Sequence, residues 1–179
     1  MALSRRLCLL APLSWALPAH ADTPPQELST ALPAAQLQGQ GRLRFFGLHV
    51  YDIRLWTPVD FAPQRWADSP LGLEIEYGRT LYGEKIAERS LDEMKRQGDL
   101  PAASAEQWLG QMKRLFPDVN AGDRLTGVHR PGIGARFYFN GRLLGEVADA
   151  DFARRFFGIW LAQQTSEPDL RERLFGRAR

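Results

Sequence analysis

The feature that most constrains this fold is a pair of short apolar segments joined by Asn140-Gly141. This dipeptide suits the two positive-φ positions of a type I′ turn, whose twist matches that of paired strands. Phe137 and Phe139 share one face of the first segment, because successive side chains of a strand alternate between the two faces. The sequence therefore predicts a β-hairpin over residues 135–147.

A strongly apolar helix is predicted directly after the hairpin, over residues 149–161. Asp149 and Asp151 fall in its first turn, where acidic side chains interact favourably with the helix dipole. Its apolar positions are too numerous for an exposed helix, and they are Phe152, Phe156, Phe157, Ile159, Trp160 and Leu161. We expect the helix to pack on one face of a sheet, with Phe137, Phe139 and Phe156 in a shared core.

The first 21 residues have the pattern of a secretory signal peptide. Arg5-Arg6 form a basic start, residues 7–17 are apolar, and Ala19-His20-Ala21 is an A-x-A cleavage site. A membrane anchor would need about 20 apolar residues, and here Pro12 lies within the apolar run and Pro18 directly after it. We expect cleavage after Ala21, a periplasmic or secreted location, and no transmembrane segment in the mature chain.

Composition argues against several classes of function. Without residues 1–21, which hold two arginines and no acid, basic and acidic residues are equal in number at 21 each. This balance argues against a nucleic-acid or polyanion binder. Cys8, the only cysteine, leaves with the signal peptide, so neither disulfides nor cysteine catalysis are expected. His49 and His129 have no acids at ligand spacing, and we expect no metal and no other cofactor. The sequence leaves the oligomeric state open.

The other segments predict an α+β domain over residues 37–176, preceded by a loose entry segment over residues 22–36. Strands are expected within residues 37–56, with a bend at Gly47, and over residues 71–77 and 125–129. Helices are expected over residues 84–97, 103–116 and 166–174.

Two further motifs have simple structural interpretations. Gly39-Gln-Gly41 precedes arginines, but no helix and no lysine-hydroxyl pair follow, so we interpret the glycines as close backbone packing rather than phosphate binding. No Gly-x-Ser-x-Gly segment indicates a serine nucleophile.

The many aromatic residues on predicted sheet and helix faces allow two interpretations. They pack a closed core, or they line an apolar cleft between the sheet and the helices. In the second case Arg42, Tyr51, Tyr82 and Arg89 are the polar groups at the mouth of the cleft.

A set of motifs, in this order, resembles the chalcone isomerase-like family, and more closely its exported bacterial branch. They are Gly39-x-Gly41-Arg42, Val50-Tyr51-x-x-x-Leu55, Phe116-Pro-Asp-Val, Gly122-Asp-Arg-Leu-Thr-Gly, Asn140-Gly141, the Phe-Phe-Gly-Ile-Trp-Leu helix and Pro168-Asp-Leu-Arg. The resemblance implies an open-faced β-sandwich, in which helices cover a large antiparallel sheet and a ligand cleft lies between the two layers.

The resemblance also implies where a site lies. Arg42 corresponds to the arginine of the plant isomerases, and Tyr82 to their tyrosine. Tyr51 stands in place of a threonine, Arg89 in place of an asparagine, and Ile159 in place of a hydroxyl residue. Because ring closure needs ordered polar donors, these replacements predict ligand binding without chalcone isomerisation, and no catalytic residue is assigned.

The leading hypothesis is therefore a periplasmic protein that binds a small apolar or amphipathic ligand, such as a fatty acid or an aromatic acid. Arg42 is expected to pair with the acidic group of the ligand. Two alternatives stay open. One is an isomerase or lyase that uses Arg42 and Tyr82 on an unknown substrate, and the other is an interaction module whose cleft is filled by its own side chains.

Overall fold

The computed structural model describes residues 23–177, so the predicted signal peptide lies outside the described residues. A six-stranded antiparallel sheet has its strands in chain order, β1-β2-β3-β4-β5-β6. The strands are β1 (Gln36–Phe45), β2 (Leu48–Thr57), β3 (Leu71–Tyr77), β4 (Arg124–Arg130), β5 (Gly134–Phe139) and β6 (Arg142–Val147). The helices are α1 (Gln26–Ala31), the short 3-10 helix η1 (Pro63–Asp68), α2 (Gly83–Lys95), α3 (Ala102–Leu115), α4 (Ala150–Leu161) and α5 (Pro168–Leu174).

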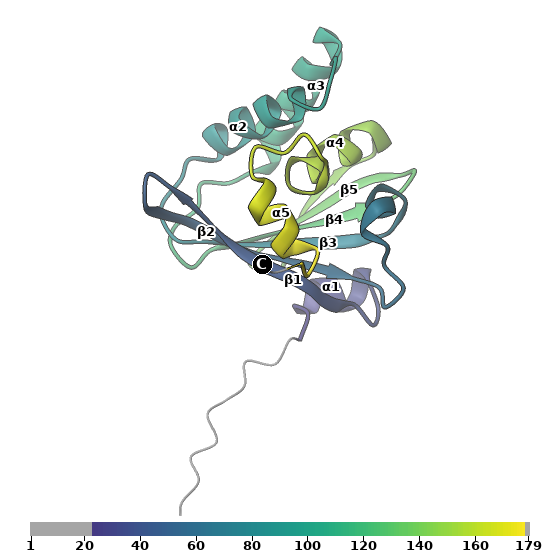
Figure 1. The fold of residues 1–179 in the computed structure, drawn as a ribbon. Helices are drawn as coiled ribbons and strands as arrows, with labels where there is room; N and C mark the ends of the chain where they lie inside the picture. The colour runs from purple at the N-terminus through teal and green to yellow at the C-terminus, as the bar shows by residue number, and fades with distance from the viewer. Residues whose placement is uncertain (1–22, 178–179) are drawn as a thin grey trace, which may run out of the picture.

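The helices form two unequal layers on the sheet. Helices α2, α3, α4 and α5 lie on one face and α1 lies on the other (Figure 1). The predicted α+β open-faced sandwich is thus confirmed, and the four main predicted helices begin and end within about two residues of the observed ones. Among residues 23–177, no helix is long and apolar enough to cross a membrane.

The central hairpin is confirmed in its turn and largely in its core. Asn140 and Gly141 both have positive φ, 48° and 84°, as a type I′ turn requires. Phe137 is fully buried, and its ring meets that of Phe156 edge to face at 5.0 Å between centroids. Phe139 is only partly buried. The hairpin and α4 therefore share an aromatic core centred on Phe137 and Phe156.

The predicted bend at Gly47 is the turn between β1 and β2. On the face of β1 that packs against α5, Gly39 lies so close to this helix that a Cβ would be 2.2 Å from the Arg173 carbonyl oxygen. A Cβ on Gly41 would lie 2.3 Å from a methyl group of Leu170. The interpretation of these glycines as close backbone packing is confirmed, because α5 rests directly on them.

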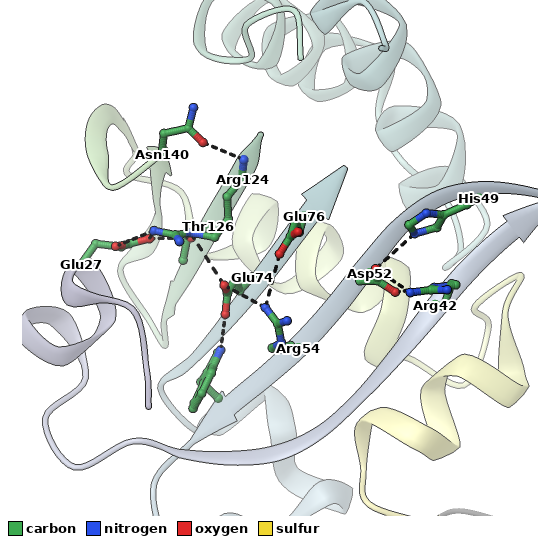
Figure 2. Close-up of polar contacts among 11 residues, drawn as sticks. Glu27, Arg42, His49, Asp52, Arg54, Glu74, Glu76, Arg124, Thr126 and Asn140 are labelled. Carbon is green, nitrogen blue, oxygen red and sulfur yellow. Dashed lines mark hydrogen bonds and ion pairs between the residues drawn. The ribbon is translucent and has the colours of Figure 1, made fainter. Parts of the chain in front are cut away.

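The expected loose entry segment is instead ordered by α1, which packs on the second face of the sheet. Leu28 is fully buried and fills the space above Gly72. The carboxylate of Glu27 accepts hydrogen bonds from Arg124 at 3.0 Å and from the Thr126 hydroxyl at 2.9 Å. Figure 2 shows these contacts as part of a row of polar side chains across this face. Tertiary contacts therefore hold a helix that is too short to be stable alone.

Candidate functional site

An apolar pocket of about 390 Å³ lies between the first four strands and the helices that cover them. Its walls include Leu43 from β1, Ile75 from β3, Leu125 from β4 and Phe156 from α4. These side chains face the pocket because alternate residues of each strand point to the helical layer. The volume lies within the range of small-molecule sites, about 300–1,000 Å³.

Charged side chains divide the pocket into a basic and an acidic end. Arg79 follows β3 and Lys85 lies in the first turn of α2. Glu93, also on the pocket wall, lies eight residues further along α2, which corresponds to roughly 12 Å of helix. Glu167, from the connection between α4 and α5, also lines the pocket.

The two cations of the basic end have different partners. Lys85 donates to the Glu88 carboxylate at 2.8 Å. Among residues 23–177, Arg79 forms no ion pair and no side-chain hydrogen bond. Arg79 is therefore the guanidinium on the pocket wall that is available to an incoming anion.

The acidic end is held by an ion-pair cluster on α2. The Glu93 carboxylate lies 2.5 Å from the Arg89 guanidinium and 3.5 Å from that of Arg96. Arg89 is thus already neutralised. The apolar surroundings of the pocket wall, and then the nearby Glu93 charge, raise the pKa of Glu167.

A hydrogen bond joins the sheet to α4 at the pocket wall. The Trp160 indole Nε1 donates to the Tyr51 hydroxyl at 2.9 Å. Tyr77 lies opposite Tyr51 in the register of β2 and β3, with the two rings 6.3 Å apart. Removal from water raises the pKa of both tyrosines, so both hydroxyls stay protonated at neutral pH. The pocket therefore offers neutral hydroxyls beside its apolar walls.

Comparisons with known proteins agree with this architecture. The chain matches the chalcone isomerase-like family over residues 23–176. It belongs to this family. It is 28% identical over 152 residues to an uncharacterized protein of Haemophilus influenzae, which covers 84% of this chain and 73% of that protein. The fold is similar to the crystal structure of an Arabidopsis thaliana fatty-acid binding protein, with a TM-score of 0.63 and 12% identity over 80% of this chain and 87% of that one.

Three of the five residues singled out from the sequence line the pocket of this chalcone isomerase-like protein. They are Tyr51, Arg89 and Ile159. Ile159 adds an apolar wall, whereas Arg89 is occupied by Glu93.

The expectation that Arg42 faces the cleft is wrong. Arg42 lies opposite Asp52 in the register of β1 and β2 and donates to its carboxylate at 2.6 Å. Figure 2 shows this pair in the polar row on the second face of the sheet. This pairing lowers the pKa of Asp52 and raises that of Arg42. Leu43 is the neighbour that lines the pocket, since adjacent residues of a strand face opposite ways.

Tyr82 is also absent from the pocket wall. Its backbone precedes α2 as the N-cap residue, and its side chain is 66% exposed. The neighbouring Leu81, by contrast, lines the pocket. The structure therefore does not bring Arg42 and Tyr82 together at the pocket.

Several polar groups of the site, among them Arg79 and the Trp160 indole, were not singled out from the sequence. Arg79 lies in the connection that follows the end of β3 at Tyr77, so the alternation of that strand does not reach it. Trp160 was one of the aromatic residues expected either in the core or along the cleft, but its hydrogen bond to Tyr51 was not predicted, because it depends on the packing of α4 against β2.

A larger and more polar hollow of about 900 Å³ lies beside η1, α3 and the start of α4. Two of its cations have structural partners: Arg155 donates to the carbonyls of Gly98 and Asp99, and Arg171 donates to that of Leu161. Among residues 23–177, no three metal-ligating side chains are grouped there or elsewhere. The smaller apolar pocket is the better candidate site.

Proposed function

We propose that this protein binds a small amphipathic acid, with its apolar chain in the 390 Å³ pocket and its carboxylate at Arg79. The observation that carries the proposal is the joining of an apolar cavity to a guanidinium that no acid among residues 23–177 neutralises. The fatty-acid binding function of the Arabidopsis thaliana neighbour supports the same ligand class.

The energetics of such a ligand fit the two ends of the pocket. Each buried methylene contributes about 0.8 kcal/mol, so the apolar walls supply affinity for a chain. A charge-assisted hydrogen bond to Arg79 fixes the direction of the carboxylate. At the other end Arg89 is held by Glu93, and Glu167 repels an anion, so the reversed orientation is disfavoured.

Binding without ring closure follows from the position of the polar groups. Cyclisation of a chalcone needs donors that are already aligned with the developing negative charge. Arg42 and Tyr82, the two residues of the isomerase or lyase alternative, do not line the pocket. The open volume also disfavours the alternative of an interaction module with a filled cleft. A periplasmic or secreted location belongs to the same proposal and is supported by the signal-peptide pattern of residues 1–21.

The experiment is a calorimetric titration of the purified protein with dodecanoate. Arg79→Ala is expected to weaken binding about tenfold, because a hydrogen bond to a charged group contributes roughly 1.5–3 kcal/mol and the exposure of Arg79 keeps this one at or below the lower end of that range. Arg42→Ala removes the same charge from the other face of the sheet and is the matched control, expected to bind as the wild type does. Equal losses in both variants, or no binding by the wild type, would contradict the proposal.

A further inference from the structure

The turn between β1 and β2 exposes a compact group of large apolar side chains. Phe45, Phe46 and Leu48 are 62%, 91% and 57% exposed. Phe46 and Gly47 both have positive φ, 48° and 79°. The Phe45 and Phe46 rings meet edge to face at 4.5 Å between centroids. We call these three residues the aromatic tip, and such a contiguous exposed apolar group marks a surface that meets a partner.

The aromatic tip lies at the basic end of the pocket. The Gly78 amide donates to the Val50 carbonyl at 2.9 Å, which holds the hairpin beside Arg79. Phe45 and Arg79 both line the pocket. Figure 1 shows the dark blue β1–β2 turn at the rim of the sheet, beside the connection that leads into α2. Phe45 therefore belongs both to the exposed tip and to the pocket wall.

The charge around the tip is positive. Arg44 folds back to donate to the Gly47 carbonyl at 3.1 Å. Within the part of the chain that the structure describes, neither Arg44 nor Arg79 pairs with an acid. Exposed aromatic side chains next to unneutralised guanidinium groups match the boundary between acyl chains and anionic headgroups.

We propose that the aromatic tip, with Arg44 and Arg79, docks this protein on an anionic lipid surface. The surface is a small protruding turn, which fits insertion between headgroups better than a broad protein interface. Docking through the aromatic tip places the basic end of the pocket at the membrane surface, and the acyl-chain layer below that surface is where long-chain acids dissolve. In that sense the inference rests on the proposed function and adds the source of the ligand.

The test is co-sedimentation of the purified protein with vesicles of equal parts phosphatidylglycerol and phosphatidylcholine. Phe46→Ser is expected to lower the vesicle-bound fraction constant at least about fivefold, since an inserted phenylalanine ring is lost from the apolar layer. Val59→Ser is the matched control: Val59 is 74% exposed but follows the far end of β2, roughly 30 Å along the strand. All variants carry the same N-terminal residues, whose apolar segment could itself bind lipid. A difference in vesicle binding between two variants therefore comes from the substituted residue.

The charge is tested in the same assay. Arg44→Gln is expected to weaken binding to these vesicles several-fold and to leave weak binding to pure phosphatidylcholine unchanged, because one basic residue near an anionic surface contributes about 1 kcal/mol. Arg154→Gln, on the exposed side of α4, removes an arginine remote from the tip and is expected to have no effect.

Three results would overturn docking: wild-type protein that stays in the supernatant, equal losses in Phe46→Ser and Val59→Ser, or self-association that Phe46→Ser abolishes without any vesicle binding. The last would assign the tip to a second copy of the chain. Titration with dodecanoate in vesicle-free solution separates the two proposals, because Phe46→Ser is expected to keep wild-type affinity there. Docking that depends on Phe46 without dodecanoate binding would sustain the docking site and refute the pocket function.

Discussion

The Trp160 indole donates a hydrogen bond of 2.9 Å to the Tyr51 hydroxyl and thereby joins α4 to β2 at the wall of the pocket. Trp160 is 7% exposed, so little water is available to replace this acceptor. Because a buried donor left without a partner is costly, this bond contributes both to stability and to the shape of the pocket.

Tyr51→Phe is therefore expected to lower the free energy of unfolding by about 1 kcal/mol, since it leaves the Trp160 donor unpaired. Tyr77→Phe is the matched control. Tyr77 lies opposite Tyr51, and its hydroxyl has no hydrogen-bond partner among residues 23–177. Urea unfolding measures both variants, and equal destabilisation would show that the indole bond is unimportant.

The aromatic core between the hairpin and α4 gives a second prediction. Phe137→Ala is expected to lower the free energy of unfolding by about 3–5 kcal/mol, because it leaves a cavity in a packed interior. Phe139→Ala should cost clearly less, since Phe139 is only partly buried. Thermal melts of the two variants test the order, and a smaller loss for Phe137→Ala would contradict the assigned core.

His129 predicts a dependence of stability on pH. Burial lowers the pKa of His129, and its Nδ1 lies 3.1 Å from the Ser69 carbonyl oxygen. The unfolded chain then binds a proton more readily than the folded chain, so stability falls as pH drops through about 6.5, the unfolded value, toward the lower folded pKa. Urea midpoints between pH 8 and pH 5 measure this loss. His129→Gln should flatten that part of the profile, and an unchanged slope in the variant would show that another group is responsible.

Chalcone cyclisation is expected to be absent. The absorbance of a 2′-hydroxychalcone should decay no faster with the protein than without it, because Arg42 is held by Asp52 away from the pocket. Loss of one aligned donor alone lowers such rates about 100-fold to 1,000-fold. Saturable, stereoselective turnover that Arg79→Ala abolishes would instead make the pocket an active site.

Local chemistry made much of the fold predictable. The turn at Asn140-Gly141 depends on two residues that tolerate positive φ, and this requirement is visible in the sequence. The density of apolar residues on α4 likewise shows that the helix is buried. Helix α1 was not predicted, because its six residues are held by Leu28 and by the Glu27 pair with Arg124, a contact across 97 positions.

The site was less predictable because it, too, depends on contacts between residues far apart in the sequence. Alternation along β1 separates Arg42 from Leu43, but only the packing of α4 and α5 decides which face holds the pocket. The partner of Arg42 is set by strand register, which pairs it with Asp52. Arg79 lies beyond the end of β3, so no strand periodicity indicates its place on the pocket wall.

The central claim is that the apolar pocket holds the chain of an amphipathic acid. The most direct measurement is the dissociation constant of dodecanoate for Ile86→Trp, compared with Ile133→Trp. Ile86 lines the pocket, whereas Ile133 is exposed at the turn between β4 and β5. The account predicts wild-type affinity for Ile133→Trp and at least about tenfold weaker binding for Ile86→Trp, because the indole takes the volume of roughly two or more methylenes of the ligand. Equal affinities in the two variants would contradict the account.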